Sequence, residues 1–85
     1  MALMEISIVP LGTTKTSLSL YVAGVIKVVQ ESGLDFELSD MGTIVQGEAD
    51  ELLKLAARMH DSVFQHDVKR VYTVIKLDDR RDKET

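Results

Sequence analysis

The sequence predicts an α+β domain in which four strands form one antiparallel sheet and two helices cover one of its faces. Two observations predict this fold. Two short segments, 3–11 and 34–39, alternate apolar and polar residues with the period of two that is typical of half-buried strands, and two further strands are expected at 43–47 and 68–77. Two longer segments between them repeat apolar residues with the period of an amphipathic helix. We expect the 85 residues to form a single domain (1–85), because a chain of this length builds one small core.

The first strand and the first helix are expected at the start of the chain. The strand covers 3–11 and presents Met4, Ile6, Ile8 and Pro10 to one face of the sheet, and Glu5, Ser7 and Val9 to the other. The helix covers 17–32, with Thr16 or Ser17 as its N-cap and Gly33 as its stop. Its predicted apolar stripe consists of Leu18, Val22, Val25, Ile26 and Val29.

A hairpin, a second helix and a last strand are expected in the rest of the chain. The hairpin joins strands at 34–39 and 43–47 through a tight turn at 40–42. The second helix covers 48–65, and its acidic first turn suits the positive end of the helix dipole. The last strand covers 68–77, and 78–85 form a charged C-terminal tail. The predicted stripe of the second helix consists of Ala49, Leu52, Leu53, Ala56, Met59 and Val63.

This order of elements is that of a ferredoxin-like domain, with strands in the spatial order 4-1-3-2. Such a topology gathers the end of the first strand, the hairpin turn, the N-terminus of the first helix and the start of the last strand near Arg70 at one end of the domain. Two interpretations of the hydroxyls there stay open: they bind a polar ligand beside the helix amides, or they cap the helix and its turns. These hydroxyls belong to Thr13, Thr14, Thr16, Ser17 and Thr43.

The sheet face away from the helices is expected to be half polar. Such a face suits a ligand pocket or a wet interface between two sheets, but it is equally compatible with an ordinary solvated surface. Its expected members are Glu5, Ser7, Val9, Glu37, Ser39, Thr43 and Val45, with either Tyr72 and Val74 or Val71 and Thr73.

Composition argues against several classes of protein. The net charge of −4 and the pI near 5 argue against a nucleic-acid binder. No apolar stretch approaches the roughly 20 residues that cross a bilayer, and we expect no signal peptide and no membrane partner. The sequence has no cysteine, which is compatible with the cytoplasmic location that we predict.

Residues that could support catalysis or bind a metal do not form a recognisable motif. His60 and His66 do not share a helix face, so we expect neither a metal site nor a metal cofactor. Glu5 and Glu37 would form an acid–base pair only if they lay close together. We therefore expect a protein that is not an enzyme.

The first helix and the last strand favour self-association. The helix is apolar around most of its circumference, and a chain this short has no second layer to cover it. The last strand lies at an edge of the sheet, where its backbone could pair with a copy.

Three segments together resemble a known family. They are 8–13 with 16–19 (IVPLGT and TSLS), 41–47 (MGTIVQG) and 70–81 (RVYTVIKLDDRR). The chain resembles the small thiamine-binding-protein-like family, which is related to YkoF-type domains that bind thiamine or hydroxymethylpyrimidine. The resemblance implies a ferredoxin-like fold, homo-oligomers built as dimers of dimers, and non-enzymatic binding of thiamine or its pyrimidine precursor.

The resemblance also implies a ligand site beside the Met-Gly-Thr segment, so Met41, Gly42 and Thr43 carry over. Family members often have Glu where this chain has Gln46, whose amide can still donate to and accept from an aminopyrimidine. The predicted site has polar contacts from Ser39 and Thr43, apolar walls from Met41 and Val45, orientation by Glu5 or Gln46, and supporting hydroxyls on Ser17 or Ser19.

The function expected from these observations is a homo-oligomeric binding protein for a small heterocycle. Two alternatives stay open. One is an allosteric ligand-sensing module that acts on a partner enzyme, and the other is a structural oligomer without a small ligand.

Overall fold

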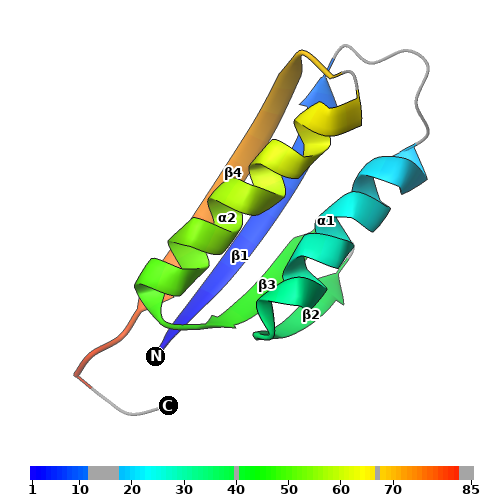
Figure 1. Ribbon diagram of the computed structural model, residues 1–85. Helices are drawn as coiled ribbons and strands as arrows, with labels where there is room; N and C mark the ends of the chain where they lie inside the picture. Colours follow the sequence, from blue (N-terminus) through cyan, green and yellow to red (C-terminus); the bar gives the residue numbers. More distant parts are fainter. Residues whose placement is uncertain (12–17, 40, 67, 83–85) are drawn as a thin grey trace.

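The computed structural model describes residues 1–11, 18–39, 41–66 and 68–82, and only the backbone at 18–20 and 66. The chain forms four strands and two helices in the predicted order (Figure 1). They are β1 (Ala2–Leu11), α1 (Leu18–Ser32), β2 (Asp35–Ser39), β3 (Gly42–Gly47), α2 (Ala49–Val63) and β4 (Arg70–Asp79), with a short 3-10 turn, η1 (Phe64–His66), after α2.

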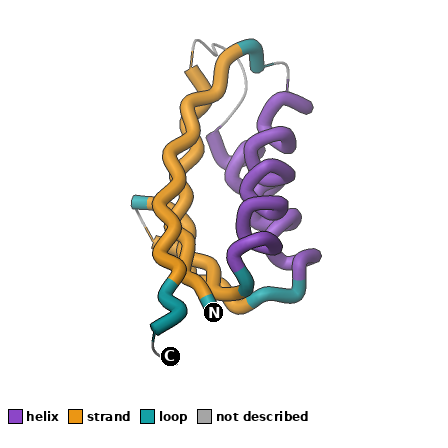
Figure 2. Tube along the Cα trace, turned by 90° about the vertical axis from the view of Figure 1, so that its left-hand side faces the viewer, coloured by secondary structure: helices purple, strands orange, loops and turns teal. Residues whose placement is uncertain are grey.

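The strands form a single antiparallel sheet in the order β2-β3-β1-β4, which is the predicted order seen from the other side. Both helices lie on one face of the sheet, and the other face is left open (Figure 2). The predicted ferredoxin-like arrangement is therefore confirmed.

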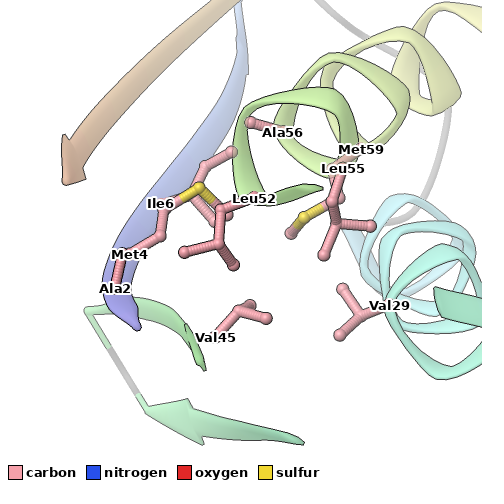
Figure 3. Close-up of a cluster of buried hydrophobic side chains, with 9 residues drawn as sticks. All are labelled: Ala2, Met4, Ile6, Val29, Val45, Leu52, Leu55, Ala56 and Met59. Atoms are coloured by element: carbon pink, nitrogen blue, oxygen red, sulfur yellow. The ribbon is translucent and has the colours of Figure 1, made fainter. Parts of the chain in front are cut away.

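The core lies between the helices and the central strands. Met4, Ile6 and Val45 project from β1 and β3 and are at most 1% exposed. They meet Leu52 and Met59 of α2, which are also fully buried (Figure 3). The alternation of β1 is thus confirmed, because its even-numbered side chains enter the core while Glu5 and Ser7 face away.

In each helix one residue of the predicted apolar stripe points to solvent. In α1 Val29 is buried as predicted, but Tyr21 is 3% exposed and its neighbour Val22, which was predicted to be buried, is 46% exposed. In α2 Leu53 is half exposed and Leu55 is buried instead, whereas Leu52, Ala56, Met59 and Val63 are buried as predicted. Neighbouring helical residues lie about 100° apart, so a residue next to the buried face points partly to solvent.

Gly33 ends α1 as predicted. Its φ of +75° lies in the left-handed region, and its amide donates to the carbonyl of Gln30. At the start of α2, Glu48 is extended and its carbonyl accepts from the amide of Leu52. The predicted caps of α1, Thr16 and Ser17, lie outside the described residues.

The register of the hairpin corrects the predicted open face. Ser39 pairs with Gly42, so only two residues separate β2 from β3, one fewer than predicted. Thr43 then lies opposite Ile6 and Val45 opposite Met4, which turns both toward the helices. Their predicted place on the open face was wrong, because a shift of one residue moves every side chain of a strand to the other face.

The register of β4 decides between the two alternatives for its open face. Tyr72 lies opposite Val9 and Val74 opposite Ser7, so Tyr72 and Val74 face away from the helices. β4 also continues two residues beyond its predicted end. Asp78 and Asp79, predicted as part of the tail, pair with Leu3 and Ala2.

Candidate functional site

The strands of the sheet differ in length, and this difference leaves a notch beside β1. All ten residues of β1 pair with β4, but only Ala2 to Ile6 pair with β3. Beyond Ile6, the second half of β1 has a strand on one side only among the described residues, and the pair β1–β4 projects past the hairpin (Figure 1). The hairpin turn thus lies beside the middle of β1. Arg70 was predicted to lie near the hairpin turn. It lies instead opposite Leu11, at the far end of β1.

A cavity of about 300 Å³ occupies this notch, between β1, the β2–β3 hairpin and α1. That volume is at the lower end of the range for small-molecule pockets, about 300–1,000 Å³. Apolar side chains form most of its wall. They come from β1 (Ile6, Ile8, Val9, Pro10), α1 (Tyr21, Val22, Val25, Ile26), the hairpin (Leu38, Met41) and α2 (Met59, Val63).

Polar groups enter the cavity from the hairpin and from β1. Ser39, Gly42 and Thr43 line it together with Ser7, which borders the notch on β1 although its side chain faces away from the helices. The hydroxyl of Ser39 holds the turn, because it donates to the carbonyl of Gly42 at 2.9 Å and accepts from the amide of Met41 at 3.3 Å. These bonds fix the backbone that presents Thr43 to the cavity.

Gly42 permits the hairpin to approach β1. Its φ is +155°, and a Cβ built at this position would lie 2.8 Å from the carbonyl oxygen of Ile6. Because that oxygen belongs to the backbone of a central strand, it cannot move aside easily. Glycine is therefore required at the point where the hairpin meets the cavity wall.

The cavity wall is uncharged over the described residues. None of the side chains that line it belongs to Asp, Glu, Lys, Arg or His. Burying an ion against such a wall would cost much more free energy than burying a neutral polar ring with a few hydrogen bonds. The geometry therefore favours a neutral ligand that can bond to hydroxyls and backbone groups.

The predicted site residues fall into two groups. Ser39, Met41, Gly42 and Thr43, all predicted as site residues, line the cavity together. Val45 does not, because it is fully buried in the core below.

Glu5 and Gln46 lie on the open sheet face, opposite the helices. Glu5 is 3.7 Å from the amine of Lys76, and both line a second hollow of about 270 Å³. The amide of Gln46 contacts the sulfur of Met1 at 3.1 Å. Neither side chain lines the cavity, so the structure does not bring them together with Thr43. Ser17 lies outside the described residues, and Ser19 lies in the first turn of α1.

Sequence reasoning missed Tyr21 and Met59 as members of the cavity wall. Met59 was predicted only as core, and Tyr21 was placed outside the stripe of α1. The spacing of Tyr21, Val25 and Val29 at intervals of four was the available signal, because it marks one helix face.

The remaining candidates for chemistry lie apart from the cavity. Glu5 and Glu37 both lie opposite Ile44, on either side of it, about 10 Å apart at the backbone. His60 bonds through Nδ1 to the hydroxyl of Thr73 at 2.7 Å and packs edge-on against Phe64. Within the described ranges, no cluster of three potential metal ligands occurs, and none of the helices is long and apolar enough to span a membrane.

Fold and cavity together define a ferredoxin-like domain with an uncharged hollow between its first helix and its sheet. The chain belongs to the thiamine-binding protein family, because the family model described as "Thiamine-binding protein" matches residues 4–85. This membership confirms the resemblance carried by the three sequence segments and points to a role in binding a small molecule.

Similar proteins come from archaea and bacteria. A UPF0045 protein of Methanothermobacter thermautotrophicus is 43% identical over 79 residues, which cover 92% of this chain and 80% of that protein. The UPF0045 protein YqgV of Bacillus subtilis is 38% identical, covering 100% of this chain and 86% of its own length.

Solved structures share the fold. A protein from Methanocaldococcus jannaschii superposes with a TM-score of 0.84 at 41% identity, covering 98% of this chain and 84% of that one. A Thermotoga maritima protein assigned to thiamine biosynthesis or salvage gives a TM-score of 0.83 at 20% identity, covering 99% and 88%, and at that identity it supports the fold alone.

Proposed function

We propose that this protein binds a neutral pyrimidine-type heterocycle, of the kind found in thiamine and its hydroxymethylpyrimidine precursor, in the cavity beside the hairpin. The observation that carries the proposal is the cavity itself, which has apolar walls and hydroxyls at one end. Family membership supports the same class of ligand. An aminopyrimidine ring would stack against the aliphatic wall from α1 and bond to Thr43 and to the backbone of the hairpin.

The same cavity discriminates between forms of the ligand. Thiamine carries a cationic thiazolium, and its phosphates add negative charges, whereas the free pyrimidine is neutral near pH 7. An uncharged wall gives no compensation for the desolvation of either ion. We therefore expect the hydroxymethylpyrimidine to bind more tightly than thiamine, and thiamine to bind more tightly than its diphosphate.

Titration calorimetry and thermal denaturation with these three compounds test the proposal. A ligand at 100 times its Kd would raise the free energy of unfolding by about 2.7 kcal/mol. An unchanged denaturation temperature and no heat of binding with any of the three compounds would refute the proposal.

A matched pair of variants locates the binding. Thr43→Val removes one hydroxyl from the cavity and keeps its shape, so we expect Kd to rise about tenfold, the effect of one hydrogen bond. Thr73→Val makes the same chemical change on β4, outside the cavity, and is expected to leave Kd unchanged. Equal effects of the two variants would contradict the assignment of the site.

We also propose that binding is non-enzymatic and that the protein acts in the cytoplasm as a homo-oligomer, a dimer of dimers. Apolar side chains exposed on the open sheet face support the assembly, among them Leu3, Tyr72 and Val74. Recovery of the pyrimidine unchanged after incubation tests whether binding is non-enzymatic. Light scattering of the purified protein tests the oligomeric state.

A further inference from the structure

The two edges of the sheet differ, and the β4 edge is the unusual one. Natural edge strands are commonly short or interrupted by proline and charge, which prevents pairing with other chains. β2 fits this pattern, with five residues that include Asp35 and Glu37. β4 has ten residues and no proline, its charges lie outside the uncharged segment 71–75, and among the described residues no strand pairs with its outer side.

Apolar side chains in the middle and second half of β4 are exposed although they belong to a regular strand. Tyr72 is 60% exposed, Ile75 43%, Leu77 37% and Val74 36%. Ile75 and Leu77 point to the helix side, yet the single chain does not cover them fully. A second layer of strand and helix beside β4 would bury these side chains.

The charges along β4 are complementary to those of the same strand running in the opposite direction. Arg70 opens the strand and Asp78 stands next to its end. Both face the open side of the sheet, because they lie opposite Leu11 and Leu3 of β1. An antiparallel copy of β4 would therefore place an opposite charge at each end of the pair.

We propose that β4 pairs with β4 of a second copy of this chain, about a twofold axis that passes through Val74 perpendicular to the sheet. Such an axis keeps both pairs of helices on one side and joins the two sheets into one. It sets Val74 opposite Val74 of the second copy. Arg70 then lies opposite Asp78 of the second copy, and Tyr72 opposite Lys76 of the second copy.

Charge selects this register over its two neighbours. In a pair related by this twofold axis, residues opposite each other point to the same side of the sheet. The axis can therefore pass only through a residue, and the alternative registers move it by one residue at a time. An axis through Thr73 would set Arg70 against Lys76 of the second copy, and an axis through Ile75 would set it against Arg80 of the second copy. By symmetry each repulsion would occur twice, and like charges directly opposite each other destabilise a strand pair.

A cysteine scan reads the register directly, since the sequence has no cysteine of its own. Residues facing each other in an antiparallel pair have Cα atoms about 4.5–5.5 Å apart, within the range for a disulfide. Under mild oxidation, Val74→Cys is expected to form a covalent dimer. Thr73→Cys and Ile75→Cys serve as matched controls. In this register neither residue lies opposite its own copy, so both variants are expected to form little covalent dimer.

Either of two outcomes would overturn the proposal: a covalent dimer that forms best at 73 or 75, or the absence of a covalent dimer at 74.

Charge reversal tests the same register without oxidation. Arg70→Glu and Asp78→Arg each replace two attractions by two repulsions, and we expect each to raise the dimer Kd about tenfold. The double variant restores opposite charges and is expected to recover the original Kd. Within one chain the two residues stand about 27 Å apart along the strand, beyond the screening length, so recovery cannot arise inside a monomer. A double variant as weak as the single variants would refute the pairing.

This proposal does not depend on the ligand. The dimer interface at β4 lies across β1 from the hairpin that lines the cavity, so the charge variants are expected to leave pyrimidine binding unchanged. Failure of the β4 pairing and failure of ligand binding are therefore separate results.

Discussion

The two faces of the sheet come from the same strands but offer different environments. On the helix side, Met4, Ile6 and Val45 are almost completely buried, and the cavity beside them is uncharged. On the open side, Glu5 and Lys76 form an exposed ion pair over a shallow second hollow. The period of two in β1 therefore separates an apolar binding environment from a charged surface one residue away.

The strand lengths decide where that apolar environment becomes accessible. A β3 as long as β1 would continue the sheet past Ile6 and fill the notch with backbone. Because β3 begins only at Gly42, opposite the middle of β1, the helix-side face is open beside the hairpin and Thr43 reaches the cavity.

The largest effect is expected in the core on the helix side. Leu52→Ala removes a fully buried side chain and should lower the free energy of unfolding by about 3 kcal/mol. Leu53→Ala, the same change one residue away at a half-exposed position, should lower it by less than about 0.5 kcal/mol. Urea denaturation measures both. Similar losses would mean that α2 is rotated differently from the structure.

A smaller loss is expected from Gly42→Ala at the hairpin. The new methyl group would meet the backbone oxygen of Ile6, and we expect a loss of about 2 kcal/mol together with weaker ligand binding. Gly33→Ala is the control, because its φ is also positive but no atom lies within 4 Å of the added carbon. It should cost about 1 kcal/mol and leave ligand affinity unchanged. Equal ligand affinity in both variants would contradict the place of Gly42 in the cavity wall.

On the open face, Glu5→Gln is expected to change little. The ion pair with Lys76 is exposed, so its loss should cost less than about 0.5 kcal/mol, and the cost should vanish at high salt. Pyrimidine affinity should stay the same, because Glu5 is not part of the cavity. A marked loss of affinity would move the ligand to the open face.

The smallest effect concerns Asp79 at the end of β4. A hydrogen bond from Arg81 and the charge of that guanidinium lower the pKa of Asp79 below its ordinary value. Because the folded pKa is depressed, the stabilisation is present above the unfolded pKa and is lost as pH falls through the folded pKa. Arg81→Ala should raise the pKa of Asp79, measured by carboxyl NMR titration. An unchanged pKa would show that the pair does not persist in solution.

The sequence predicted the elements of the fold and most of their buried faces, but not every position on them. Alternation in β1 has one interpretation, because Met4 and Ile6 are apolar where Glu5 and Ser7 are polar. In α1, apolar residues on most sides gave no such contrast, so Tyr21 was missed. The hairpin register depended on whether two or three residues form the turn, and the wrong choice moved Thr43 and Val45 to the other face.

The site was predicted only in part. Met41, Gly42 and Thr43 followed from the family resemblance, Ser39 followed from the hairpin, and all four line the cavity. Gln46 followed from the same resemblance and Glu5 from its place on the sheet, but the register puts both on the open face. The notch itself depends on the difference in length between β1 and β3, which the strand boundaries predicted from sequence do not resolve.

The central claim is that a neutral pyrimidine binds on the helix side of the hairpin, and amide NMR during titration with hydroxymethylpyrimidine tests it most directly. We expect saturable shifts at Thr43, Tyr21 and Val25, with Glu5 and Gln46 unchanged. Shifts confined to Glu5, Gln46 and their neighbours on the open face, or no shifts at all, would contradict the claim.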